Sequence, residues 1–135
     1  AGFCSSLGPC MKRHVSSEAA VPADRAWKAF ELAEQLEKLD TSKIPYREFL
    51  RVPSLSLGVY RLPAGAKDLQ APHDEDEVYF VISGSGKVRI DGRERTVGRG
   101  SILFVRATAE RSFFEIEEDM TLLVFFASGG PSDED

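Results

Sequence analysis

Hydrophobic residues follow one period before Pro45 and another after it. In the first part, apolar side chains recur at about every third or fourth position, at Trp27, Phe30, Ala33, Leu36 and Leu39. This spacing places them on one face of a helix, and Pro22 suits the first turn of such a helix. The pattern predicts an N-terminal amphipathic helix over residues 22–39, with its apolar stripe packed against a sheet.

After Pro45 the chain changes to short apolar runs separated by turn signals. Leu55, Leu57 and Val59 alternate with smaller or polar residues, as in a half-buried strand. Asp91-Gly92 between two such runs is typical of a two-residue hairpin turn. Further strands are expected at residues 77–83, 87–90, 93–97, 101–106, 111–116 and 120–127, with residues 117–119 as a turn. About seven strands at such short intervals indicate an all-β sandwich or barrel.

The chain of 135 residues has the length of one domain. We expect residues 22–127 to fold together, after a flexible segment (1–21) and before a disordered acidic tail (128–135). The first ten residues are interpreted as an extension that precedes a natural start at Met11. Both cysteines, Cys4 and Cys10, lie in that extension. Thiol chemistry is therefore excluded from Met11 onward, and a reducing, cytoplasmic location is expected.

Charge and hydropathy indicate which classes of partner the chain could bind. The formal net charge is -5, and no basic stretch appears that would suit a phosphate backbone. The longest apolar run, Leu122–Ala127, is far shorter than the roughly 20 residues that span a bilayer. A small-molecule ligand or substrate is expected, and neither nucleic acid nor a membrane.

One of the two histidines, His73, directly precedes four consecutive carboxylates, residues 74–77. In an extended chain Glu75, Glu77 and Tyr79 share one face, and His73 lies within reach of Glu77. An imidazole and carboxylates that converge could hold a divalent metal. The alternative is that these charges only keep a hydrophobic strand soluble.

The succession of strands, turns and this histidine–carboxylate cluster along the chain resembles the cupin superfamily from about Ser54 to Ala127. The chain looks like a small bacterial cupin. In the first cupin motif two histidines precede a glutamate and a closing glycine. Here His73 matches the second histidine, Glu77 the glutamate and Gly84 the glycine, whereas Ala71 stands at the first histidine.

The second cupin motif is more divergent. Gly100 matches its first glycine, Arg106 stands at the proline position and Glu110 at the histidine position. The resemblance implies an all-β fold: a single cupin-type β-barrel (a double-stranded β-helix, or jelly roll) with an N-terminal helix. It also implies that His73, Glu77 and Glu110 surround one point inside the barrel.

One imidazole and two carboxylates would suit iron, manganese, nickel or zinc. Glu75 and Gln70 are further candidate ligands, and Tyr79 and Arg106 are expected to line the pocket. A metal-free arrangement stays open. If the arginine at position 106 or 111 turns inward, a Glu110–arginine pair could occupy the metal's place, since buried carboxylates need a cation.

Three functions remain at this point. The protein could be a metal-dependent enzyme that acts on a small polar molecule, with dioxygenase- or isomerase-like chemistry. It could be a metal-free cupin that binds a small ligand beside a vestigial site. It could also be a structural module whose barrel is filled by side chains. The sequence does not decide whether it is an enzyme. The resemblance implies a homodimer, because cupins are often dimeric.

Overall fold

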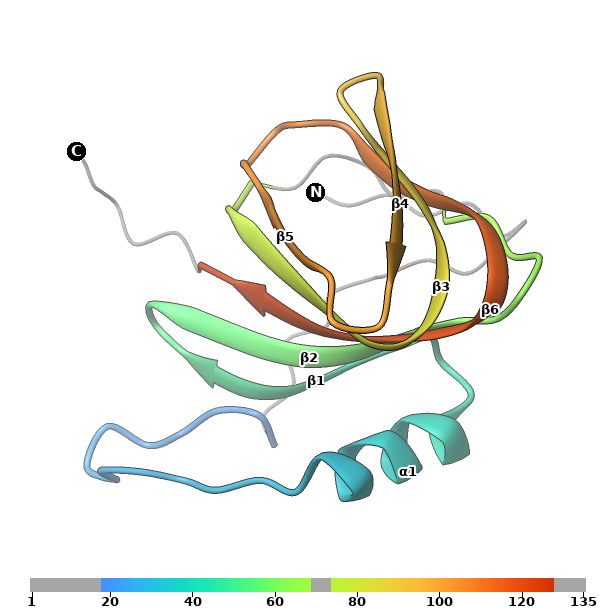
Figure 1. Cartoon of the computed structure of the whole chain (residues 1–135). Coiled ribbons are helices and arrows are strands. Elements are labelled where there is room, and N and C mark those ends of the chain that lie inside the picture. Colours follow the sequence, from blue (N-terminus) through green and yellow to red (C-terminus); the bar gives the residue numbers. More distant parts are fainter. Residues whose placement is uncertain (1–17, 69–73, 128–135) are drawn as a thin grey trace.

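A computed structural model of the chain describes residues 18–68 and 74–127 (Figure 1). It contains one helix and six strands: α1 (Leu32–Ser42), β1 (Tyr46–Val52), β2 (Leu55–Leu62), β3 (Glu77–Ile90), β4 (Arg93–Gly98), β5 (Ile102–Val105) and β6 (Arg111–Phe126). The strands pair antiparallel in the order β1-β2-β6-β3-β4, and β5 pairs with β3. The predicted all-β fold with an N-terminal helix is confirmed.

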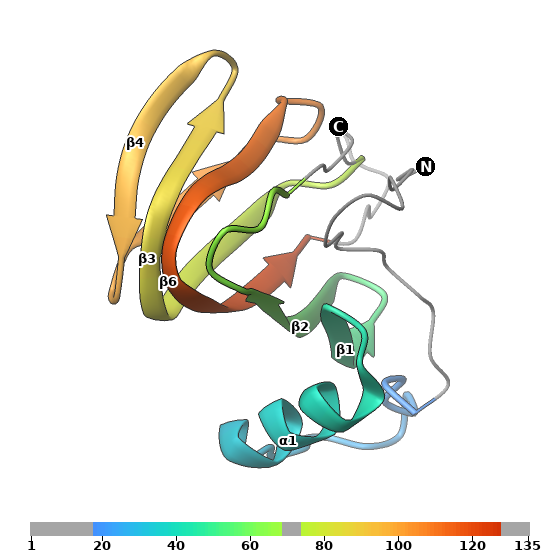
Figure 2. The same ribbon diagram turned by 90° about the vertical axis from the view of Figure 1, so that its right-hand side faces the viewer.

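The two long strands, β3 and β6, bend the sheet into a deep curl (Figure 2). They pair from Glu77 opposite Phe126 to Ile90 opposite Arg111, with register shifts in the middle of β3. At the bend Gly84 has φ +92°, and a Cβ there would lie 2.1 Å from the Asp119 carbonyl oxygen. Only glycine tolerates both the conformation and the contact. In the described residues no ladder joins β4 or β5 to β1, so the sheet is a curled jelly roll, not a closed barrel.

The concave side of this sheet holds the main core. Every strand contributes to it, and Tyr79 meets Phe113 edge to face at 5.1 Å between ring centroids. The buried side chains are Tyr46, Tyr60, Leu62, Tyr79, Val81, Val88, Val97, Val105, Phe113, Ile116, Met120, Leu122, Val124 and Phe126. The two layers of the curl are thus held together mainly by apolar packing.

The helix covers the convex side of β1 and β2 (Figure 1). Leu39 packs there with Phe49 and Val59. The helix begins at Leu32, ten residues after the predicted start. The chain before it is extended where it pairs with β1. Residues 19–21 run beside the edge of β1 through hydrogen bonds with Arg51. Trp27 consequently lies outside the helix and is 74% exposed, so it does not belong to the apolar stripe.

Two predicted turns lie inside continuous strands. The glycines after residue 83 are part of β3, and residues 117–119 are part of β6, because bulges absorb the bend without ending the pairing. Strand β1 was not predicted. The hairpin at Asp91-Gly92 is confirmed, with φ of 49° and 82°. No helix in the described part of the chain is long and apolar enough to cross a membrane.

Candidate functional site

The start of β3 directs alternate side chains to opposite sides of the sheet, as predicted. Glu77, Tyr79 and Val81 are buried on the concave side, whereas Val78 and Phe80 are only partly buried. A glutamate at 1% exposure in this series is exceptional, because a buried carboxylate loses its hydration. The structure must therefore supply a partner for Glu77.

That partner is Arg111, the first residue of β6. Its Nη1 donates a hydrogen bond to Glu77 Oε1, and both side chains are fully buried. The two backbones lie at opposite ends of the β3–β6 ladder, since Glu77 pairs with Phe126 and Arg111 with Ile90. The side chains therefore meet across the concave space, and the curl of the sheet brings them together.

The rest of the Arg111 guanidinium is fixed by the loop between β5 and β6. Nε and Nη2 donate to the Ala109 carbonyl oxygen at 3.1 and 2.9 Å, and Nη2 also donates to the Arg106 carbonyl oxygen at 2.9 Å. Because Arg111 is held by these bonds as well as by Glu77, it is a fixed internal cation.

Burial raises the pKa of Glu77 to about 7. The charge of Arg111 opposes this rise, and hydrogen bonds from Tyr79 and Arg111 oppose it further. Desolvation thus outweighs the stabilisation of the carboxylate by its partners. Tyr79, on the same face of β3, is in contact with Glu77 through one of these hydrogen bonds.

A second buried carboxylate, Asp68, contacts the same core. The Tyr60 hydroxyl donates to Asp68 Oδ1 at 2.6 Å, and the Phe113 amide donates to Oδ2 at 3.2 Å. Burial and the neighbouring Asp68 charge raise the pKa of Tyr60 well above its usual value. Sequence reasoning missed this pair, because Asp68 lies between two predicted strands and has no local pattern that marks it as buried.

Glu110, the third predicted ligand, is not brought to Glu77. Its side chain is exposed, and its backbone exchanges hydrogen bonds with Asp91 at the β3–β4 hairpin. Neighbouring residues of an extended chain point to opposite sides, so the inward position belongs to Arg111. The expected convergence of Glu77 and Glu110 is corrected to a convergence of Glu77 and Arg111.

The other predicted residues lie in four different settings. Tyr79 is buried beside Glu77 and belongs to the core cluster. Arg106 is exposed, and its guanidinium lies 5.0 Å from the Phe104 ring centroid, so only its carbonyl oxygen contacts the site. Glu75 is partly buried. His73 and Gln70 lie outside the described residues.

A divalent metal does not fit the described residues. Within residues 18–68 and 74–127 no group of three histidine, cysteine, aspartate or glutamate side chains is placed to hold one. The Glu77 carboxylate is already neutralised by Arg111. A metal there would have to displace a cation that also bonds to the carbonyl oxygens of Arg106 and Ala109.

A curled antiparallel sheet with an apolar core on its concave side is the architecture of a jelly-roll protein. The chain belongs to the cupin family, since the family's cupin domain matches residues 58–126. The uncharacterized protein SCO3923 of Streptomyces coelicolor is 40% identical over 100 residues, which cover 74% of this chain and 95% of that protein.

Solved structures agree on the fold. Salicylate 1,2-dioxygenase from Pseudaminobacter salicylatoxidans superposes with a TM-score of 0.58 and 21% identity over 72% of this chain, which spans only 32% of the dioxygenase. KdgF from Halomonas sp. gives a TM-score of 0.57 and 17% identity over 63% of this chain and 80% of KdgF. At these identities the likeness establishes the fold alone.

Proposed function

We propose that this protein is a cupin that binds a small polar molecule in its curled sheet without a resident transition metal. Arg111 takes the position that the family resemblance gives to the metal. The observation that supports this proposal is the fully buried contact between Arg111 and Glu77. The metal-free alternative expected from the sequence paired an inward arginine with Glu110, whereas the partner of Arg111 is Glu77.

The charge balance favours the arginine over a metal. Removing one partner of a buried ion pair costs about 3–5 kcal/mol, because the other charge is left uncompensated. A metal that replaced Arg111 beside Glu77 would need a binding free energy larger than this cost, and it would have few other ligands. The rival proposal keeps His73, Glu77 and Glu110 as ligands of iron, manganese, nickel or zinc, and it requires Arg111 and Glu110 to exchange places.

A small-molecule ligand is supported by the chemistry of the concave face. Glu77, Tyr79 and Arg111 are polar side chains among otherwise apolar neighbours, and ligand sites commonly combine a few polar groups with an apolar lining. One neighbouring structure, salicylate 1,2-dioxygenase, is described as an adduct with gentisate, a small organic acid. We further propose that the protein is cytoplasmic, because both cysteines lie in the first ten residues. We also propose that it is a homodimer, because Ile102 and Phe104 form an exposed apolar surface.

Metal analysis tests the proposal. Wild-type protein is incubated with iron, manganese, nickel or zinc, desalted and subjected to elemental analysis, and we expect far less than one metal per chain. Arg111→His removes the cation and adds an imidazole beside Glu77, so metal retention should rise. Arg106→His, which adds an imidazole at an exposed position, is the matched control and should retain no more than wild type. Stoichiometric metal in wild type that is lost in His73→Ala would refute the proposal.

A further inference from the structure

A cavity of about 350 Å³ lies on the convex side of the sheet, outside the site around Glu77. Its walls come from the N-terminal segment (18–30), the first turns of α1, and β1. Figure 2 shows α1 and this segment beneath β1, on the side away from β3 and β4. The volume falls within the range of small-molecule sites, roughly 300–1,000 Å³. The proposed function makes no use of this cavity.

Arg47 of β1 is held in position at the wall of the cavity. Its Nε donates to Gln35 Oε1 at 3.1 Å, and Gln35 on α1 is only 5% exposed. A buried amide is costly without a hydrogen bond, and an apolar residue at this position would pack as Leu39 does one turn later. The glutamine therefore serves to orient the guanidinium, whose Nη2 is 3.8 Å from the well-exposed carboxylate of Glu18.

The lining is formally neutral, with three acidic and three basic side chains, but ion pairs distribute this charge unevenly. Glu34 pairs with Lys38 at 3.3 Å, and Glu48 forms a two-bond pair with Arg51, at 2.6 and 3.1 Å. Two of the three lining carboxylates are thereby neutralised.

Lys28 and Arg47 then face only the exposed Glu18 carboxylate among the described acidic groups of the lining. The adjoining first turn of α1 adds the positive end of the helix dipole. An anionic group is therefore the complement of this end of the cavity.

The remaining wall is apolar. Phe30 and Phe49 meet edge to face, with centroids 4.9 Å apart, next to Ala19 and Ala29. The pairing of β1 with β2 shifts register between Glu48 and Leu50, and this bulge lets three consecutive β1 residues line the cavity. Bulges often re-aim side chains at functional sites.

We propose that this cavity binds a small organic acid, with its carboxylate between Arg47 and Lys28 and its apolar part against Phe30 and Phe49. Benzoate combines these two features and is a suitable probe, and benzamide is its neutral counterpart of the same shape. Trp27 is the only tryptophan of the chain and precedes Lys28, so its fluorescence can report binding. Isothermal titration of the full chain provides the affinity and the stoichiometry.

We expect one benzoate per chain, no saturable binding of benzamide, and weakening by about tenfold or more in Arg47→Gln and in Lys28→Gln, since each removes one charged hydrogen bond. Arg93→Gln, at an exposed position on β4, is the control and should bind as wild type. Lys28 is itself exposed, so its variant tests the site even where Arg47→Gln lowers stability. Absence of saturable benzoate binding to wild type, equal binding of benzamide, or unchanged affinity in both cavity variants would each overturn the inference.

Discussion

Arg111 and Glu77 stabilise the fold only as a pair. Each charge loses its hydration inside the sheet, and the contact between them, with the carbonyl oxygens that hold the guanidinium, replaces what water supplied. The pKa of Glu77, raised to about 7, indicates that the replacement is incomplete. A carboxyl whose folded pKa lies above its unfolded value stabilises the protein at low pH, and this contribution is lost as the pH rises through the folded pKa.

Arg111→Met should therefore destabilise the protein in a pH-dependent way. Without the guanidinium the folded pKa of Glu77 rises further, so the ionised form becomes still more costly. We expect a loss of about 3–5 kcal/mol near pH 8 and a smaller loss near pH 5, where Glu77 can hold its proton. Urea unfolding at both pH values measures the difference in free energy.

The double variant Arg111→Met/Glu77→Gln is the control for this prediction, because glutamine resembles the protonated acid and does not titrate. Its loss of stability should change little between the two pH values. A single-variant loss that is equal at pH 5 and pH 8 would contradict the assignment of Glu77 as the group that titrates.

The sequence predicts the inward residues of β3 correctly, but it places the inward residue at the start of β6 one position too early. Alternation along a short strand is a local property, so the inward positions of Glu77 and Tyr79 could be predicted. The partner depends on where β6 begins, and a shift of one residue moves every side chain to the other face. Glu110 and Arg111 differ by this single step. His73 stays a prediction.

At the level of elements, the bend in β3 depends on Gly84. A residue with a Cβ there must adopt φ near +92° and also push the β6 backbone away at Asp119. Gly92 has a similar φ of 82°, but a Cβ at that position meets nothing within 4 Å. The two glycines thus separate the cost of the backbone conformation from the cost of the contact.

Gly84→Ala should consequently destabilise the protein much more than Gly92→Ala. The hairpin variant bears only the left-handed conformation, about 1–2 kcal/mol. The bend variant bears the same strain and a collision with backbone that cannot move without opening the β3–β6 ladder. Thermal unfolding of both variants gives the comparison. Equal losses would mean that the close approach of β3 to β6 at Gly84 adds nothing.

The same glycine explains why the element boundaries were only partly predictable. Glycines at 84 and 86 and the acidic run at 117–119 resemble strand ends in sequence. In the folded chain both stretches continue their strands through a bulged bend. Whether a strand continues through a glycine depends on a partner about thirty residues away, which local patterns do not reveal. The late start of α1 has the same origin, since the edge of β1 holds the residues before it.

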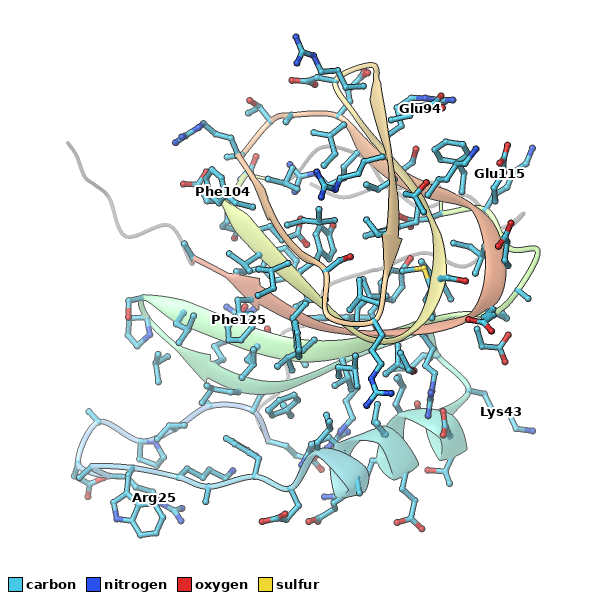
Figure 3. The ribbon with its side chains drawn as sticks, viewed as in Figure 1. Arg25, Lys43, Glu94, Phe104, Glu115 and Phe125 are labelled. Atoms are coloured by element: carbon cyan, nitrogen blue, oxygen red, sulfur yellow. The ribbon has the colours of Figure 1, made fainter. Side chains whose placement is uncertain are left out.

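At the level of the molecule, an apolar surface on the convex side of the sheet continues from the area that α1 covers, where Leu123 packs, toward β5. Val78 lies opposite Phe104 and Phe125 in the neighbouring strands, and Phe80 lies opposite Ile102 and Leu123. We call these six residues the convex apolar patch. Ile102 and Phe104 are 68% and 55% exposed, and Figure 3 shows Phe104 and Phe125 on the same side of the molecule.

The proposed homodimer would bury this patch against a second copy of the chain. Contiguous apolar surface on a soluble protein commonly marks an interface, and a patch that meets itself across a two-fold axis is self-complementary. The patch contains no charged side chain, so two chains of net charge -5 can approach there with the least repulsion. Strand β5, with Ile102 and Phe104, is the most exposed part and should lie near the axis.

Phe104→Glu should therefore convert the dimer into a monomer, because two carboxylates would be brought together in an apolar contact. Light scattering after size exclusion measures the mass of the wild-type protein and of the variant over a range of concentrations. Thr96→Glu adds the same charge at an exposed position on β4, outside the patch, and should leave the dimer intact. A monomeric wild type, or a Phe104→Glu variant that stays dimeric, would show that a second copy does not cover the patch.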